Sequence, residues 1–248
     1  MAKNTESNLY TVLFATGMVI VVGALLAYLA ASLKDKIAEN KRIEKQQNIL
    51  YAMGINDNEE GSVEFISKDI VEEVFSKNIT KQLVFKGNDV IEDKDAYLID
   101  IKKEETLAKK DSYQRRLPLF IGQKDGEELY IVPVRGKGLW DAIWGYVALT
   151  EDLIVYGVYF DHKGETPGLG SNIKERFFMD DFKGEHILDN GVFKGIDVAK
   201  GNADPKNLDK TDFEVDAIAG STITGDGLAM MLKKDLKMYI PHLKKLKQ

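Results

Sequence analysis

The sequence predicts an α+β fold in which a single N-terminal transmembrane helix precedes one domain with an antiparallel or mixed sheet and flanking helices. Three observations predict it. Leu9–Leu33 holds 25 residues without a charged side chain, strand-like segments cluster between residues 128 and 161, and an amphipathic segment closes the chain. Because strands and helices do not alternate regularly, α+β is favoured over a doubly wound parallel sheet.

The charge-free segment is long enough to cross a membrane. A helix of 25 residues reaches roughly 37 Å at about 1.5 Å per residue, which exceeds the roughly 30 Å hydrocarbon core and permits some tilt. A cleaved signal peptide would have a shorter apolar region, a basic start and a small-residue cleavage site. Lys3 is the only basic residue before this segment, and "AYLAAS" matches a cleavage site poorly. We therefore expect a retained anchor in membrane lipid at residues 9–33, after a tail at residues 1–8.

The segment after the anchor is charged and helix-prone. Lys34–Ile55 is expected to continue the helix into water as a stalk. Apolar residues close the stalk, and we expect it to dock through Ile49, Leu50 and Met53 onto a domain at residues 56–248.

Helix and strand signals then follow in order. Ser67–Ile79 starts with a serine suited to capping and has apolar residues at helical spacing, whereas the charged segment 88–111 is expected to be loop and edge structure. Three strands are predicted after it, with a hairpin turn at "ED" between the last two, over the segments Glu128–Val134, Ile143–Thr150 and Leu153–Asp161.

The last part of the chain predicts a short strand and a long helix. Gly191–Ala199 can add a further strand, and an amphipathic helix is expected from Gly227 onward. Its apolar face would consist of Leu228, Met231, Leu232, Leu236, Tyr239 and Ile240.

Composition excludes several classes of function. The net charge is −6 without a basic stripe, so we expect no nucleic-acid partner. The chain has no cysteine, which excludes disulfides, thiolate iron–sulfur ligands and a cysteine nucleophile. Its three histidines lack metal-ligand spacing, so we expect no bound metal. Redox chemistry would therefore require an organic cofactor.

Two glycine-rich motifs follow strands. In "RGKGLW", Arg135–Trp140, two glycines permit close backbone approach to a ligand and the tryptophan offers a flat face; the alternative is a tight turn with a packed tryptophan. In "GETPGLGS", Gly164–Ser171, Leu169 lies among glycines and a proline. That loop suits a flat aromatic ligand, and the alternative is a plain surface loop.

A third motif, "DAIAGSTIT" at Asp216–Thr224, comes shortly before the terminal helix. Free backbone amides and the helix dipole favour an anion such as phosphate at that place. The alternative is an ordinary helix start, capped by Thr224 or Asp226.

Together the motifs resemble a known family. "VPVRGKGLW", "GETPGLG" and Asp-x-x-x-Gly-Ser-Thr-x-Thr, in this order behind one membrane helix, are similar to NqrC, a component of the sodium-translocating NADH:quinone oxidoreductases. The last two motifs are shared by the wider family of covalent FMN-binding domains. "RGKGLW" and the stalk narrow the resemblance to NqrC.

The resemblance implies covalently bound FMN. In the family, the last threonine of a Ser/Thr-Gly-Ala-Thr motif carries FMN through a phosphoester bond. The matching positions here are Ala219, Gly220, Ser221 and Thr222, so Thr222 is the implied attachment residue and Asp216 the leading aspartate. Alanine replaces the first hydroxyl and Ser221 replaces the family's alanine, whereas the glycine and the acceptor are kept.

The resemblance also implies the rest of the flavin site. No residue is expected to act as an acid–base catalyst or a metal ligand. Besides Thr222, the residues expected to bind FMN are Glu165, Thr166, Gly168, Leu169, Gly138, Trp140, Asp216, Gly220, Ser221 and Thr224.

The implied function is that of a membrane-anchored flavoprotein subunit that relays electrons from NADH toward quinone in a sodium-pumping complex, without activity as an enzyme alone. Its partners would be the other subunits and a flavin transferase. The alternatives are the G subunit of the related ferredoxin:NAD oxidoreductase complex, decided by co-purifying partners, and a non-redox binding module, decided by flavin absorbance.

The distribution of basic residues and the family resemblance predict opposite sides of the membrane for the domain. Basic residues after the anchor outnumber Lys3 and the N-terminal amine, which favours a cytoplasmic domain; they are Lys34, Lys36, Lys41, Arg42 and Lys45. The family implies a periplasmic domain on the bacterial inner membrane, because an exported flavin transferase attaches FMN there. We follow the family.

Overall fold

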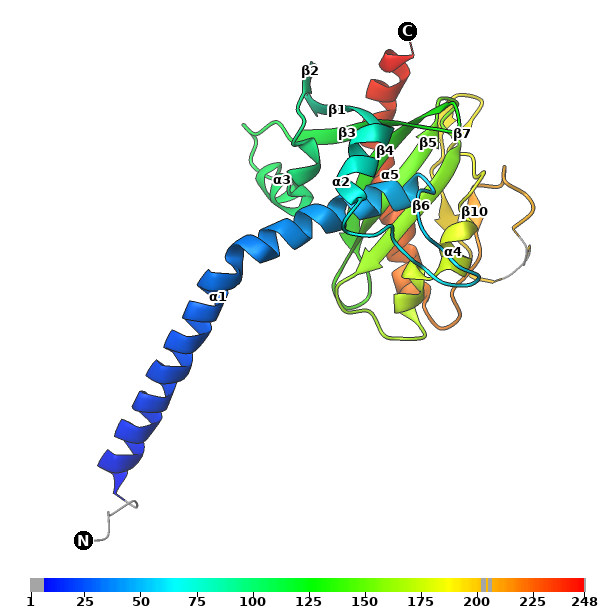
Figure 1. The fold of residues 1–248 in the computed structure, drawn as a ribbon. Coiled ribbons are helices and arrows are strands. Elements are labelled where there is room, and N and C mark those ends of the chain that lie inside the picture. Colours follow the sequence, from blue (N-terminus) through cyan, green and yellow to red (C-terminus); the bar gives the residue numbers. More distant parts are fainter. Residues whose placement is uncertain (1–6, 202–203, 205–206, 248) are drawn as a thin grey trace. The chain divides into compact units, whose positions relative to one another are not determined.

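The structure is a computed structural model of the 248-residue chain that describes residues 7–201, 204 and 207–247. Most of the expected N-terminal tail, with Lys3, lies outside the described residues. The chain divides into two compact units, Met1–Arg42 and Ile43–Gln248, which are coloured by residue number in Figure 1.

The anchor and the stalk belong to one continuous helix, α1 (Asn8–Ala52). Its apolar window has a mean hydropathy of 2.4 with none of it buried, so by length and composition it can cross a membrane. The helix ends where Gly54 has φ +70° and the amide of Ile55 donates to the carbonyl of Leu50. Glycine commonly ends helices with this backbone geometry, because it lacks the Cβ that disfavours positive φ.

A six-stranded antiparallel sheet forms the centre of the second unit, in the order β2-β1-β3-β4-β5-β6. The last three strands lie where the sequence predicts them, and the predicted turn at Glu151–Asp152 joins β5 to β6. The α+β fold is therefore confirmed. The strands are β1 (Ile79–Lys86), β2 (Asp89–Glu92), β3 (Arg116–Lys124), β4 (Glu127–Lys137), β5 (Ala142–Thr150) and β6 (Val155–His162).

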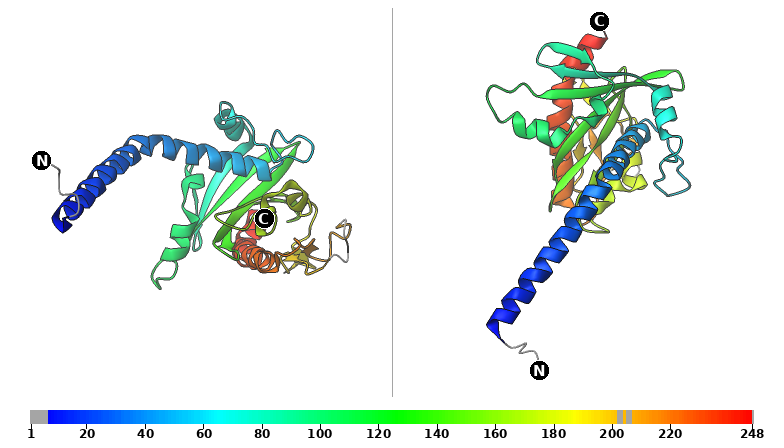
Figure 2. Two further views of the ribbon diagram at one scale, coloured as in Figure 1. Left: turned by 90° about the horizontal axis from the view of Figure 1, so that it is seen from below. Right: turned by 60° about the vertical axis from the view of Figure 1, so that its left-hand side comes forward.

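Helices cover both faces of the sheet (Figure 2). α5 (Thr222–Leu246) packs on one face through β4, and the end of α1 with α2 (Val71–Asn78) lies on the other. Ile49, Leu50 and Met53 are fully buried, and the predicted apolar face of α5 is buried as well.

The start of α5 differs from the prediction. The helix begins at Thr222 and continues through Gly225 and Gly227 instead of starting at Gly227. A Cβ at Gly227 would collide with the carbonyl oxygen of Lys137, and a Cβ at Gly225 would lie 3.1 Å from Val198. These glycines therefore permit close packing of the helix.

The segment before β4 also differs from the prediction. α2 starts at Val71, because Ser67 accepts from the amide of Asp69 in a turn and does not cap the helix. The expected loop at 88–111 contains β2, η1 (Ala96–Leu98) and α3 (Ile101–Leu107). Asp100 caps α3 by accepting from the amide of Lys103.

Short elements connect β6 to α5. They are η2 (Gly170–Lys174), α4 (Arg176–Asp180), β7 (Leu188–Asp189), β8 (Val192–Phe193), β9 (Asp197–Val198) and β10 (Glu214–Val215). The strand expected within Gly191–Ala199 is thus two strands of two residues each. β9 pairs in parallel with β10, which leads the chain into α5.

Candidate functional site

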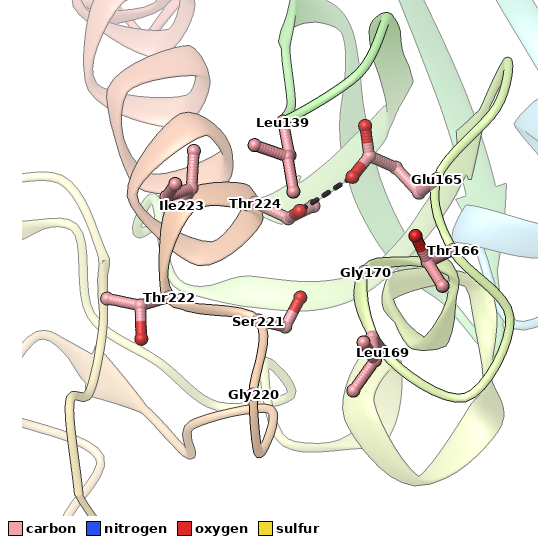
Figure 3. A pocket seen from close by; sticks show the side chains of 10 residues that line it. All are labelled: Leu139, Glu165, Thr166, Leu169, Gly170, Gly220, Ser221, Thr222, Ile223 and Thr224. Atoms are coloured by element: carbon pink, nitrogen blue, oxygen red, sulfur yellow. Dashed lines mark hydrogen bonds between the residues drawn. The ribbon is translucent and has the colours of Figure 1, made fainter.

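A cavity of about 280 Å³ lies where three distant segments meet (Figure 3). The β4–β5 turn contributes Leu139, the loop after β6 contributes residues of Glu165–Gly170, and the start of α5 contributes Gly220–Thr224. All three glycine-rich motifs therefore reach one site.

Glu165 connects these segments. Its side chain is buried, and Oε2 accepts a hydrogen bond from Oγ1 of Thr224 at 2.7 Å. Oε1 accepts from the backbone amides of Trp140 at 2.9 Å and Asp141 at 3.4 Å. The backbone amide of Glu165 donates to Nδ1 of His162 at 3.1 Å. One carboxylate thus joins the β4–β5 turn and the loop after β6 to the first turn of α5.

The hydrogen bonds keep this carboxylate charged. Burial alone would raise the pKa of Glu165, but donation from Thr224 and the backbone amides of 139–141 outweighs it and lowers the pKa. The glycines beside it leave room for the charged group. A Cβ at Gly138 would lie 2.6 Å from Oε1, and one at Gly170 would lie 2.6 Å from both Oε2 and Oγ1 of Thr224.

Trp140 lies outside the cavity wall. Its side chain is 65% exposed, and Nε1 donates to Oγ1 of Thr166 at 3.2 Å. The amide of Gly138 donates to the carbonyl of Asp141, which closes a tight turn. The tight turn of the alternative is present, but Trp140 is exposed and not packed, and its side chain connects the turn to the loop after β6.

The start of α5 presents two hydroxyls of different exposure. Thr222 is exposed as the first residue of the helix, whereas Ser221 is 6% exposed. In Figure 3 the hydroxyl of Ser221 points into the cavity, and that of Thr222 points away from Glu165 and Thr166. Thr222 also lines a smaller cavity of about 80 Å³ beside Lys200. The first amides of a helix lack partners within it, and the helix dipole favours an anion there.

Apolar side chains supply the remaining walls. Leu139, Leu169 and Ile223 are between 41% and 59% exposed around the cavity. Leu169 was expected there, whereas Leu139, Ile223 and Gly170 were not. All three lie inside the predicted motifs, and membership of a motif is the signal that the sequence carries for them.

The expected site residues fall into two groups. Those that line the cavity are Glu165, Thr166, Leu169, Gly220, Ser221, Thr222 and Thr224. Those that do not line it are Gly138, Trp140, Gly168 and Asp216. Gly168 has φ +75°, a backbone conformation that favours glycine in the turn of this loop. Asp216 directly follows β10. Their assignment to FMN stays a prediction.

Sequence comparisons match this part of the chain to a domain family. Residues 138–237 match the FMN-binding domain family, and this range contains every residue of the larger cavity's wall. The C subunit of the Na(+)-translocating NADH-quinone reductase from Pseudomonas aeruginosa is 31% identical over 92% of this chain and 91% of its own. The protein of the same name from Vibrio anguillarum is also 31% identical, over 92% and 90%.

Solved structures agree with the sequence comparisons. The crystal structure of the C subunit of the Na(+)-translocating NADH-quinone reductase from Parabacteroides distasonis has a TM-score of 0.71 and 31% identity, covering 85% of this chain and 96% of that one. The crystal structure of NqrC from Shewanella oneidensis has a TM-score of 0.65 and 25% identity, covering 83% and 99%.

Proposed function

The chain belongs to the NqrC family, the C subunits of the Na(+)-translocating NADH-quinone reductases, and we propose that it carries FMN, attached covalently through Thr222, as the flavoprotein subunit of such a complex. In this proposal it takes part in electron transfer from NADH toward quinone. One observation carries the proposal: Thr222, the residue matched to the attachment position, begins α5 at the edge of a cavity whose wall lies within the FMN-binding match.

The residues present fit FMN. The cavity volume of about 280 Å³ is close to the lower end of small-molecule sites, roughly 300–1,000 Å³. Half-exposed aliphatic side chains suit a flat ring, and hydroxyls with free helix amides suit its polar parts. Oγ of Ser221 is buried without a hydrogen-bond partner among the described residues, which is consistent with a partner supplied by a ligand.

Exposure distinguishes the two candidate acceptors. A flavin transferase must reach the hydroxyl that it esterifies, and Thr222 is exposed whereas Ser221 is buried. Thr222 would form the phosphoester bond, with the first amides of α5 toward the phosphate. Leu139, Leu169 and Ile223 would contact the ring and shield it from water. FMN when bound supplies the redox chemistry, and the protein supplies its binding, orientation and electrostatic surroundings.

Glu165 contributes as a positioning residue. Both of its oxygens are occupied by Thr224 and by backbone amides of the β4–β5 turn. It therefore acts on the flavin through the segments that it holds together.

We place α1 in the bacterial inner membrane and the flavin domain on the periplasmic side. The length and hydropathy of α1 support an anchor, and the family resemblance, with its exported flavin transferase, supports the side. A C-terminal reporter that is active only in the periplasm is expected. Activity only in the cytoplasm would show that the basic residues after the anchor decide the orientation.

Purification of the tagged full chain from membranes that contain the flavin transferase tests the function. We expect flavin absorbance, co-purification of the other reductase subunits, and loss of sodium-dependent quinone reduction by NADH from membranes that lack this chain. A colourless protein, or co-purification with a ferredoxin:NAD oxidoreductase, would contradict the proposal.

A further inference from the structure

Ser221 occupies the N-cap position of α5 without capping it. A serine at this position ordinarily accepts a hydrogen bond from an amide of the first turn. Here φ is −126°, ψ is 28°, and the side chain makes no capping bond. The carbonyl of Ser221 accepts from the amide of Gly225, so the helix starts there while its side chain remains available.

The hydroxyl of Ser221 lacks a partner inside the protein. Oγ is buried and has no hydrogen-bond partner among the residues that the structure describes. Figure 3 shows it directed into the larger cavity, on the side of Thr166 and Leu169. Leaving a buried hydroxyl unpaired opposes folding, because the group has given up its hydrogen bonds to water.

The nearby polar groups are already engaged. Oγ1 of Thr224 donates to Glu165, and Oγ1 of Thr166 accepts from Trp140. Neither hydroxyl forms a hydrogen bond with Oγ of Ser221, so a molecule that enters the cavity can supply its partner. The family's alanine at this position could not make such a bond, so the feature distinguishes this chain from the family pattern.

On the premise of the proposed function, we infer that Oγ of Ser221 forms a hydrogen bond with the part of the bound FMN that enters the larger cavity. Thr222 binds the nucleotide covalently at the exposed start of α5, and Ser221 forms a hydrogen bond with it inside the cavity. The bond makes attachment of FMN more stabilising in this chain than it would be with alanine at 221.

A thermodynamic cycle on the full chain in detergent tests this inference. The wild type and Ser221→Ala are each prepared with and without the flavin transferase, and the unfolding of the soluble domain is followed by circular dichroism. Without flavin, Ser221→Ala removes an unpaired buried hydroxyl; with flavin, it removes a hydrogen bond. Attachment should therefore raise the melting temperature more in the wild type, by roughly 2–4 °C.

The preparations are matched before melting. Mass and in-gel flavin fluorescence should show equal loading of the wild type and Ser221→Ala. Ser76→Ala provides a control, because Ser76 is an exposed serine of α2 and should give the wild-type shift.

The outcomes separate this inference from the proposed function. Equal loading with equal shifts would mean that solvent satisfies the hydroxyl in both forms, and it would overturn the inference alone. Loss of flavin from Ser221→Ala with retention in Thr222→Val would make Ser221 the attachment residue, which overturns both assignments. A wild type that takes up no flavin would overturn the proposed function and this inference with it.

Discussion

Oγ1 of Thr224 donates a hydrogen bond of 2.7 Å to Oε2 of Glu165, which joins the first turn of α5 to a loop 59 positions earlier in the chain. Thr224 is buried, and its hydroxyl is used within the protein. The second threonine of the terminal motif thus has a structural role distinct from that of Thr222. This bond therefore holds the start of α5, where Thr222 lies, against a loop that lines the cavity.

Replacement of Glu165 by glutamine should destabilise the domain. The variant keeps the shape but removes the charge and places an amide group against donors from Thr224 and the β4–β5 turn. Hydrogen bonds to charged groups contribute about 1.5–3 kcal/mol, and we expect a loss of that order in urea unfolding. Glu73→Gln, on the exposed face of α2, is the control. Unchanged stability of Glu165→Gln would show that the carboxylate does not hold the segments together.

A second buried carboxyl, Glu185, should make stability depend on pH. It is fully buried; Oε1 accepts from Nδ2 of Asn207 at 2.9 Å and lies 3.3 Å from Nζ of Lys210. Burial raises its pKa to about 7 against the lowering effect of these two neighbours. Burial and the charge of Asp216 likewise raise the pKa of Asp181 to about 6.

The direction of this pH dependence follows from the difference in proton binding between the folded and unfolded states. Because the folded state binds these protons more tightly than the unfolded chain, the contribution of Glu185 is fully present below about pH 4.5 and is lost as pH rises through about 7. The contribution of Asp181 is fully present below about pH 3.8 and is lost as pH rises through about 6. Glu185→Gln should flatten this part of the profile, by at most about 3 kcal/mol at 1.36 kcal/mol per pKa unit. Urea midpoints between pH 4.5 and 8 measure it. A variant with the wild-type slope would show that Glu185 ionises freely in the folded protein.

Strands that consist of continuous apolar runs could be predicted from the sequence. Strands with polar residues or proline, and a helix start that depends on close backbone packing, could not. Apolar runs identified β4, β5 and β6. In contrast, β1 and β3 were not predicted, because β1 contains the polar residues Lys81 and Gln82 and β3 contains Pro118. The helix was expected to begin at Gly227, yet it begins five residues earlier, and the close approach of the Lys137 backbone requires a glycine at 227 inside α5.

At the site, the motifs identified which loops meet but not which way each side chain faces. Glu165 lines the cavity as expected, and its two carboxylate oxygens accept hydrogen bonds from Thr224 and from the turn at Trp140; its contact with flavin stays a prediction. Leu139 and Ile223 line the cavity although no periodic pattern marks them. Side-chain direction in a loop follows from its backbone path, which local composition does not determine.

Removal of the anchor should leave a folded, soluble domain only if the end of α1 is kept. A protein that begins at Lys34 retains Ile49, Leu50 and Met53, each fully buried. Burial of such side chains contributes about 1.5–3 kcal/mol each, and a total stability of about 5–15 kcal/mol does not tolerate their loss. A protein that begins at Asn56 should therefore aggregate. Equal solubility and equal melting temperatures would show that α1 does not contribute to the core.

Leu169→Ala should change the flavin without releasing it. Leu169 lines the cavity and is 41% exposed, so truncation would admit water to the ring and shift its absorbance and reduction potential. Attachment should persist, because Thr222 is unchanged. Leu208→Ala is the control, since Leu208 is 77% exposed and outside the cavity wall. An unaltered flavin spectrum and potential in Leu169→Ala would restrict this loop to a structural role.

Thr222→Val should abolish covalent flavin while the fold survives. Valine keeps nearly the same shape but lacks the hydroxyl that forms the ester, and the exposed position at the start of α5 tolerates it. With an active flavin transferase, the wild type should fluoresce on a denaturing gel and gain the mass of FMN less water. Thr222→Val should show neither signal, whereas Thr222→Ser, which restores a hydroxyl, should recover at least part of both. If Thr222→Val keeps the fluorescent band, the acceptor is another residue. If the wild type also lacks the band, the start of α5 is an ordinary helix terminus.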